Sequence, residues 1–503
     1  TLMKKEITYI KDLQEHINEI VQLSGWVYNM RSSGSLVFIE CRDGSGICQC
    51  ILNKEELSDN EWTIASGLKQ ESALQISGRV VADERSLGGV ELQVTGISLI
   101  QQVEDYPITP KEHGVEFLMN HRHLWLRSQR QWAAMRVRNG IIFAIHTFFQ
   151  GRGFIQTDTP IFTPNAAEGS TTLFETDFFD QKAYLAQTGQ LYGEALAMAH
   201  GLIYTFGPTF RAEKSKTRRH LSEFWMIEPE MAFYDLEMNM DLAEDMLRFI
   251  VKTILDNYAS ELHILERDTT SLEKLVDKAF VRITYDRAVE ILRSEDTASL
   301  LDQMLEDRKT EKDTILQEQK ELQKEHGSAK KWRKKQIEKR ISDINSRVDQ
   351  IDEDMRNLPK WKTSAQNFEW GQDFGGSDET VLTMQYDVPV MVTHWPAEIK
   401  AFYMKRDESN TYALGVDVLA PEGYGEIVGG SQREDDLDLL LERIEEEGLD
   451  QSVFEWYLDL RRFGSVPHAG FGLGLERTVA WICGLSHVRE TIPFPRMMGR
   501  ITP

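Results

Sequence analysis

The sequence predicts an α+β fold divided into more than one domain. Strand patterns dominate from about residue 20 to residue 103, and behind them strands and helices alternate without long parallel βαβ repeats. A chain of 503 residues is also longer than one hydrophobic core usually serves. We therefore expect a small N-terminal β domain followed by a larger α+β domain.

Composition limits the possible function classes. The chain is 41% hydrophobic and 27% charged, has no run of 18 or more apolar residues, and begins without the apolar core of a signal peptide. Its four cysteines are too few for a disulfide framework in a chain of this length. We expect a cytoplasmic protein without a membrane span. The net charge of −24 argues against a general nucleic-acid coat, although a local basic face could still bind RNA.

The first domain is predicted to be an OB barrel. Alternating or apolar strand patterns occupy 21–27, 36–42, 47–51, 74–81 and 90–100. The turn 43–46 joins the second and third strands, and a helical stretch at 54–69 precedes the fourth. Five short strands with a helix before the fourth is the order of an OB barrel, a common carrier of single-stranded RNA. We assign residues 1–103 to this barrel and 104–120 to a hinge.

The second domain, 121–503, is predicted to open with a helix. Apolar residues recur with a helical period from 130 to 150. Glycines at 151 and 153 end this helix before a short strand that closes at Pro160.

A charged segment, residues 294–361, is predicted to form an inserted helical hairpin. Glu, Lys, Asp, Arg and Gln dominate it, apolar residues recur every three or four positions, and Gly327 and Ser328 interrupt it near the middle. Two antiparallel helices that pack only on each other are the simplest interpretation. The alternative is a contact with RNA or a protein partner through the basic second arm. The basic residues of that arm are Lys330, Lys331, Arg333, Lys334, Lys335, Lys339 and Arg340.

Three short stretches of the second domain carry the clearest chemical signal. They are residues 153–160, the run from Phe210 to Glu213 that continues to His220 and Phe224, and the glycine-rich run 470–477. Together, over about 320 residues, they resemble the three signature motifs of class II aminoacyl-tRNA synthetases. With an OB domain in front, the chain resembles the subgroup that charges aspartate, asparagine and lysine.

The resemblance implies a fold, an assembly and a reaction. The catalytic domain is expected on an antiparallel sheet, and the first motif is expected to pack across a two-fold axis, which makes a homodimer. The amino-acid carboxylate would attack the α-phosphate of ATP, pyrophosphate would leave, and the terminal adenosine of tRNA would then attack the adenylate.

The resemblance also implies an ATP site. Arg211 would hold the α-phosphate and the amino-acid carboxylate, and Arg477 would hold the γ-phosphate. A guanidinium suits both roles because it stays charged and binds phosphate bidentately. Phe224 would stack on adenine opposite Arg477. The other residues expected at ATP are Glu213 at the adenine amine, and Arg218 and His220 at the outer phosphates.

Two carboxylates near the phosphates predict magnesium. Glu426 and Asp417 precede the glycine-rich stretch 428–433, and Mg²⁺ prefers hard oxygen ligands of this kind. Glu426 is expected to be a ligand, whereas a purely structural role stays open for Asp417.

Residues 187–194 predict which amino acid is used. Aspartyl members of the subgroup have, at the position of Gly193, a Lys that pairs with the substrate carboxylate. Here an aspartate would lose that cation and approach Glu194, whereas the amide NH₂ of asparagine would gain an acceptor. Arg433 matches the Arg that holds the side-chain oxygen in both enzymes. The residues expected at the substrate ammonium are Glu168, in a loop that closes over the substrate, Gln190 and Glu228.

Four barrel residues are expected to contact the anticodon. Arg31, Phe38 and Gln49 match residues that read the middle base in aspartyl relatives, Phe38 by stacking and the others by hydrogen bonds. Glu91 is a candidate for the first base. Asparagine and aspartate tRNAs share these two bases, so the four residues cannot separate them. For Phe38 the alternative is an ordinary position in the barrel core.

These expectations combine into one reaction. Its expected substrates are L-asparagine, ATP with Mg²⁺, and tRNA(Asn). The alternatives are an aspartyl enzyme, including one that charges both tRNAs, a paralogue that uses the adenylate for other chemistry, and a catalytically silent RNA-binding protein.

Overall fold

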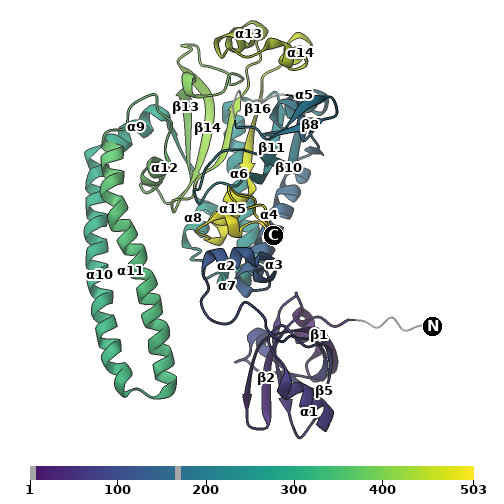
Figure 1. Cartoon of the computed structure of the whole chain (residues 1–503). Helices are drawn as coiled ribbons and strands as arrows, with labels where there is room; N and C mark the ends of the chain where they lie inside the picture. Colours follow the sequence, from purple (N-terminus) through teal and green to yellow (C-terminus); the bar gives the residue numbers. More distant parts are fainter. Residues whose placement is uncertain (1–6, 165–171) are drawn as a thin grey trace, which may run out of the picture. The chain divides into compact units, whose positions relative to one another are not determined.

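The computed structural model describes residues 7–164 and 172–503, which form two compact units divided between Leu118 and Met119. Figure 1 shows one small unit made of a barrel and one larger unit made of a sheet and helices. This division falls within the predicted hinge, residues 104–120. Residues 102–114 are in neither a helix nor a strand.

The N-terminal unit is a closed five-stranded barrel with the order β1-β2-β3-β5-β4. Its strands are β1 (Ile20–Ser33), β2 (Leu36–Arg42), β3 (Ile47–Asn53), β4 (Ala73–Ala82) and β5 (Val90–Gln101). α1 (Asp59–Gly67) precedes β4 and begins with a capping box between Ser58 and Glu61. Alternate residues fill the barrel, so that Leu23 and Ile39 are fully buried. The predicted OB barrel is confirmed.

The larger unit is built on an eight-stranded sheet with the order β12-β13-β14-β15-β16-β11-β10-β6. Its strands are β6 (Ile155–Thr157), β10 (Leu202–Phe210), β11 (Glu223–Ala232), β12 (Val281–Thr284), β13 (Val390–Pro396), β14 (Tyr412–Ala420), β15 (Gly425–Gln432) and β16 (His468–Gly474). The strands from β13 to β10 pair antiparallel, whereas β12 and β6 pair in parallel at the two edges. A small second sheet contains β7 (Phe162–Thr163), β9 (Gln181–Leu185) and β8 (Glu175–Phe178). The predicted antiparallel sheet is confirmed, with parallel strands added at its edges.

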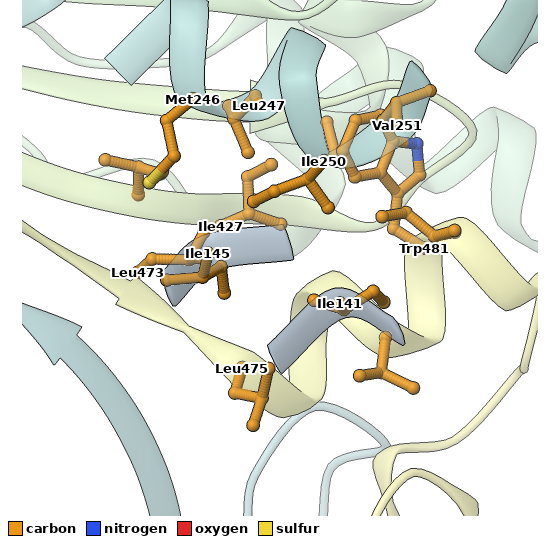
Figure 2. Close-up of a cluster of buried hydrophobic side chains, with 14 of the residues drawn as sticks. Ile141, Ile145, Met246, Leu247, Ile250, Val251, Ile427, Leu473, Leu475 and Trp481 are labelled. Carbon is orange, nitrogen blue, oxygen red and sulfur yellow. The ribbon is translucent and has the colours of Figure 1, made fainter. Parts of the chain in front are cut away.

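Three helices hold the central strands in place. α4 (Gln129–Gly151), which matches the predicted helix, packs with α6 (Leu236–Asn257) and α15 (Leu475–Cys483). Figure 2 shows Ile141 and Ile145 of α4 beside Ile250 of α6, Leu473 of β16 and Trp481 of α15, and all five side chains are fully buried. Each such burial contributes about 1.5–3 kcal/mol. This core therefore fixes the strands that carry the site.

The charged insertion forms the predicted hairpin. Its arms are α10 (Glu295–Ser328) and α11 (Lys331–Gln366), so the second arm extends past the expected end at 361. Buried residues at seven-residue intervals form the seam of α11, as in a coiled coil; they are Ile337, Ile344, Ile351 and Leu358. Ion pairs join the arms, such as Lys312–Asp352 at 2.6 Å.

The remaining helices are shorter. They are α2 (Val115–Asn120), α3 (Arg122–Trp125), α5 (Gln190–His200), α7 (Ala259–Ile264), α8 (Thr270–Asp277), α9 (Tyr285–Arg293), α12 (Gly376–Thr383), α13 (Leu437–Glu446) and α14 (Glu455–Arg462). Across residues 7–164 and 172–503, no helix combines the length and the apolar character that crossing a membrane requires.

Candidate active site

A cavity of about 270 Å³ lies where the β10–β11 hairpin meets the start of α15. Six residues predicted at ATP line it; they are Arg211, Glu213, His220, Phe224, Glu426 and Arg477. Strand pairing explains how distant parts of the sequence meet here. β10 and β11 are antiparallel neighbours, and β16 pairs with the other side of β11 immediately before α15 begins.

Glycines let the backbone approach closely on one side of the cavity. A β-carbon at Gly472 would lie 2.5 Å from Cε of Met226, so a larger residue there would displace the end of the Met226 side chain. The next turn begins α15, where Glu476 is buried and its carboxylate accepts hydrogen bonds from Arg138 at 3.1 Å and from the Trp225 amide at 3.1 Å. This inward anchor fixes the first turn of α15, which carries Arg477 into the cavity lining.

The two predicted phosphate-binding arginines differ in their contacts. Arg477 donates to the carbonyl oxygens of Glu426 at 3.0 Å and Arg219 at 3.3 Å. The Arg211 guanidinium lies 5.3 Å from the ring centre of Phe224, a cation–π distance. The cavity therefore combines two fixed cations with an aromatic face.

The loop between β10 and β11 supplies further polar groups. Burial, followed by the charge of Arg477, lowers the pKa of His220, so the ring is neutral at pH 7. Arg219 lines the cavity beside His220, whereas the predicted Arg218 lines an adjoining cavity of about 170 Å³ that shares Arg219 and Arg477. Arg219 was not among the residues predicted at ATP, although it belongs to the same Arg-Arg-His run, residues 218–220.

The two predicted metal carboxylates lie next to the same glycine, Gly429. A β-carbon at Gly429 would lie 2.7 Å from Oε1 of Glu426 and 3.7 Å from Oδ1 of Asp417. Lys400 donates to Asp417 at 3.0 Å. Within the described ranges, the Glu426 carboxylate has no hydrogen bond or ion pair. Burial, opposed by Lys400 and assisted by Glu426, raises the pKa of Asp417 to about 7.

A second cavity, of about 490 Å³, adjoins the first and shares Arg211, Met226, Glu426, Gly429 and Gly472 with it. Its lining includes three residues predicted at the amino acid, namely Gln190, Glu228 and Arg433. Lys400 and Tyr403 also line it and were not predicted.

Glu228 is positioned by the start of α5. Its carboxylate accepts hydrogen bonds from the Gly189 amide at 2.7 Å and from the Thr188 hydroxyl. Only 6% of Glu228 and 7% of Gln190 are exposed, and both line the cavity from neighbouring elements. A buried carboxylate beside a buried amide is suited to binding an ammonium group.

Arg433 forms a buried ion pair with Glu230, which sequence reasoning missed. Its guanidinium donates twice to the Glu230 carboxylate, from Nη2 and from Nε at 3.3 Å, and Nη1 donates to the Ser431 hydroxyl at 2.8 Å. Burial, opposed by Arg433, raises the pKa of Glu230 to about 7. The missed signal is strand alternation, because Phe224, Glu228 and Glu230 are all separated by even numbers along β11.

Glu230 is also the carboxylate next to Gly193. A β-carbon at Gly193 would lie 3.3 Å from Cγ of Glu230, and one at Gly470 would lie 2.3 Å from its Cδ. Both glycines therefore make room for this side chain.

The expectation for Glu194 is corrected by the structure. Its side chain is fully buried and, like that of Glu230, is not among the residues that line the second cavity. Glu194 differs from Glu230 in its partners, which do not include the cavity-lining Arg433. The carboxylate is occupied by Tyr457 at 2.7 Å, His468 at 2.7 Å and Arg461 at 3.0 Å. Burial opposes ionisation, but Arg461 and His468 outweigh it and lower the pKa of Glu194 to about 2. The residue anchors α14 to α5, because its partners lie on α14 and β16.

Glu168, which was predicted at the substrate ammonium, lies outside the described residues.

The four predicted anticodon residues lie on the barrel. Arg31 and Phe38 are paired across β1 and β2, and the guanidinium lies 4.7 Å from the ring centre. Gln49 and Glu91 are paired across β3 and β5, and the Gln49 amide donates to the Glu91 carboxylate at 3.4 Å. Phe38 is partly exposed, which leaves part of its ring available for stacking.

Comparison with known proteins identifies the family. The model described as "tRNA synthetases class II (D, K and N)" matches residues 114–498, and an OB-fold nucleic acid binding domain matches residues 21–100. The chain belongs to the class II tRNA synthetases of this subgroup, as its motifs predict. It is an aminoacyl-tRNA ligase.

Individual relatives agree on one member of the subgroup. The chain is 51% identical to the asparagine–tRNA ligase of Sorangium cellulosum over 494 residues, covering 98% of both chains. It is 48% identical to the corresponding ligase of Symbiobacterium thermophilum over 493 residues, again covering 98% of both. A solved relative is the asparaginyl-tRNA synthetase of Pyrococcus horikoshii complexed with asparaginyl-adenylate. It aligns with a TM-score of 0.83 and 37% identity, over 99% of this chain and all of that one.

Proposed function

We propose that this protein attaches L-asparagine to tRNA(Asn) in two steps, through an asparaginyl-adenylate. One observation carries the choice of amino acid: the Arg433–Glu230 pair lies next to Gly193, where an aspartyl enzyme would place a cation. The relatives named asparagine–tRNA ligase support the same choice.

The side-chain pocket would bind both the oxygen and the NH₂ group of the asparagine side-chain amide. The Arg433 guanidinium donates to the side-chain oxygen, and Glu230 accepts from the NH₂ group. Aspartate would instead bring a second carboxylate toward Glu230, with no additional cation at Gly193 to offset the repulsion. A site built from buried polar groups discriminates strongly, because the wrong ligand leaves them unpaired. We assign the acceptor role to Glu230 because its carboxylate is bonded to Arg433, which lines the cavity. The Glu194 carboxylate is instead bonded to Tyr457, Arg461 and His468, which do not line it.

The remaining polar residues would position the reacting groups. Gln190 and Glu228 hold the ammonium of asparagine. Arg211, which lines both cavities, holds the carboxylate and the α-phosphate at the point where they react. Arg477 neutralises the outer phosphate, and Phe224 carries the adenine. No side chain needs to remove a proton, so orientation and charge neutralisation supply the rate enhancement.

Magnesium fits the carboxylates beside Gly429. Glu426 lines both cavities, and its carboxylate oxygens, which have no partner among the described residues, are hard ligands of the kind that Mg²⁺ prefers. Glu426 would be the main protein ligand, and Asp417 would contribute less because it is bonded to Lys400. When bound with ATP, Mg²⁺ would neutralise the phosphates and the leaving pyrophosphate.

The barrel would supply tRNA specificity. Phe38 would stack on the middle anticodon base, Arg31 and Gln49 would bind its edge, and Glu91 would contact the first base. Stacking of this kind is worth about 1–3 kcal/mol per base.

We also propose a homodimer formed through the first motif. Several apolar side chains on or near this segment are exposed in the single chain, which is typical of an interface. They are Phe143 (64% exposed), Ile155 (44%), Phe162 (53%) and Phe179 (92%). The expected cytoplasmic location stays a prediction.

Charging of a tRNA(Asn) transcript with labelled asparagine tests the proposal. Wild-type protein should form ester-linked asparaginyl-tRNA, and Arg211→Ala should abolish adenylate formation while leaving tRNA binding intact. Charging with aspartate in place of asparagine would refute the proposed amino acid. Binding of tRNA without adenylate formation in the wild type would favour the silent RNA-binding alternative.

A further inference from the structure

The charge of the helical hairpin is divided along its length. The end of the hairpin, residues 318–340, contains nine Lys or Arg against four Glu, a net charge of +5. The rest of the two helices, 295–317 and 341–366, contains seven Lys or Arg against twelve Asp or Glu, a net charge of −5. We call residues 318–340 the hairpin tip. This positive end belongs to a chain whose net charge is −24.

Ion pairing uses few of the cations in the hairpin tip. Arg333 pairs with Glu325 at 2.7 Å, and Arg340 pairs with Glu318 at 2.7 Å. The lysines of the tip have no carboxylate partner in the described part of the chain; they are Lys320, Lys324, Lys330, Lys331, Lys334, Lys335 and Lys339. Near the base, by contrast, Lys309 pairs with Glu306 and Lys362 pairs with Asp302. The arms are held together by the seam, so the free lysines are not needed to close the hairpin.

The tip arrangement is also unfavourable for the helix that carries it. α11 begins at Lys331 and has no acidic residue in its first turn. Cations at a helix N-terminus oppose the helix dipole, which favours anions there. Trp332, in the same turn, is 63% exposed. Clustered cations and an exposed aromatic ring that the fold does not use are the combination expected for binding a nucleic-acid backbone and an unpaired base.

We propose that the hairpin tip binds the phosphate backbone of the tRNA that this protein charges. Lys331, Lys334 and Lys335 contact phosphates, and Trp332 stacks on an exposed base or sugar of the same segment. The acidic remainder of the hairpin repels the backbone, which confines the contact to the tip.

Position and length suit this role. α10 has 34 residues, so the arm is about 50 Å long. The base of the hairpin packs on α9 and α12, and Figure 1 shows the remainder as a separate rod. The hairpin is inserted between β12 and β13, in the same domain that carries the adenylate site. A tRNA that places its acceptor end in this domain extends well beyond the domain itself. An arm of this length can therefore reach parts of the molecule that the catalytic cavities cannot.

The inference rests on the proposed function, and a matched pair of variants separates the two. The tip variant is Lys331→Gln/Lys334→Gln/Lys335→Gln. The control variant is Lys309→Gln/Lys360→Gln/Lys362→Gln, which removes three lysines near the base of the same hairpin. Two readouts are compared: asparagine-dependent ATP–pyrophosphate exchange without tRNA, and the Kd of tRNA(Asn) measured from about 50 to 200 mM salt.

Both variants should keep exchange within about twofold of the wild type. The tip variant should weaken tRNA binding about five- to tenfold at the lower salt and reduce the slope of log Kd against log salt by about three, one for each phosphate contact removed. The control variant should have the same Kd and the same salt slope as the wild type. Equal Kd and equal slope for the two variants would overturn the hairpin proposal while leaving the enzyme's function intact. A wild-type protein without asparagine-dependent exchange would instead refute the proposed function, and with it this inference.

Discussion

Gly193 on α5 faces Glu230 on β11, with only 3.3 Å between Cγ of Glu230 and the place a β-carbon of residue 193 would occupy. The carboxylate beyond it is bonded by Arg433. In the proposed function, recognition of the asparagine side chain depends on the lack of a side chain at Gly193 and on the Arg433–Glu230 ion pair next to it.

Placing a cation at residue 193 should reduce the use of asparagine as a substrate. In Gly193→Lys, the ammonium would pair with Glu230 and remove the acceptor for the amide NH₂. We expect asparagine-dependent ATP–pyrophosphate exchange to lose about 100-fold or more in kcat/KM, with a smaller loss for aspartate. The control is Gly151→Lys, at the exposed end of α4, where a β-carbon would have nothing within 4 Å. A loss equal for both amino acids would contradict the proposed reading of the amide.

Glu230 and Glu194 should fail in different ways when each is changed to Gln. Glu230→Gln keeps the shape but adds a donor, so aspartate should gain on asparagine by about tenfold or more in relative kcat/KM. Glu194→Gln leaves Arg461 buried without its anion, which should cost about 3 kcal/mol of stability. Chemical denaturation and exchange kinetics, measured for both variants, separate these effects. Discrimination lost only in Glu194→Gln would restore the role first expected from the sequence.

The Mg²⁺ requirement of the exchange reaction should depend more on Glu426 than on Asp417. Glu426→Gln removes a carboxylate that has no protein partner among the described residues, whereas Asp417 is bonded to Lys400. We expect Glu426→Gln to raise the Mg²⁺ concentration needed for half-maximal exchange about tenfold, and Asp417→Asn to raise it less. Titration of Mg²⁺ at fixed ATP gives both values. The reverse order would place the metal on Asp417.

Glu379 lies on α12, where its carboxyl accepts a hydrogen bond from the Glu426 amide at 2.8 Å. This carboxyl should make the free energy of unfolding fall as pH rises. Burial, followed by Glu426, raises its pKa to about 7 from the ordinary 4.5. Because the folded state binds this proton more tightly, the stabilising contribution is complete below about pH 4.5 and is lost as pH rises through 7. Between about pH 5 and pH 8, the free energy of unfolding should therefore fall by about 2 kcal/mol less in Glu379→Gln than in the wild type. Denaturation curves at several pH values measure this, and parallel profiles for the two proteins would contradict it.

Most residues predicted at ATP line one cavity, and the sequence could place them together because they sit in short, ordered motifs. Arg211 and Phe224 belong to one β-hairpin, and Arg477 follows the strand beside it, so local motif order implies their meeting. The predicted barrel follows from strand alternation in the same way. These features depend on nearby residues and on strand pairing that the motifs already specify.

The amino-acid pocket was harder to predict because it depends on long-range partners. Glu194 is adjacent to Gly193 in sequence, but helix geometry turns it toward Arg461 on α14, a contact that no local pattern encodes. Glu230 reaches the same place from another strand. Lys400 was missed because it comes from the segment between β13 and β14 and meets Asp417 only in the folded sheet.

The most direct test of the account is amino-acid-dependent ATP–pyrophosphate exchange by the purified protein with asparagine, aspartate and lysine. The account predicts exchange with asparagine at least about 100-fold more efficient than with aspartate, and none with lysine. Exchange with aspartate equal to or faster than with asparagine would contradict the reading of Arg433 and Glu230, even if the fold and the ATP site remained as described.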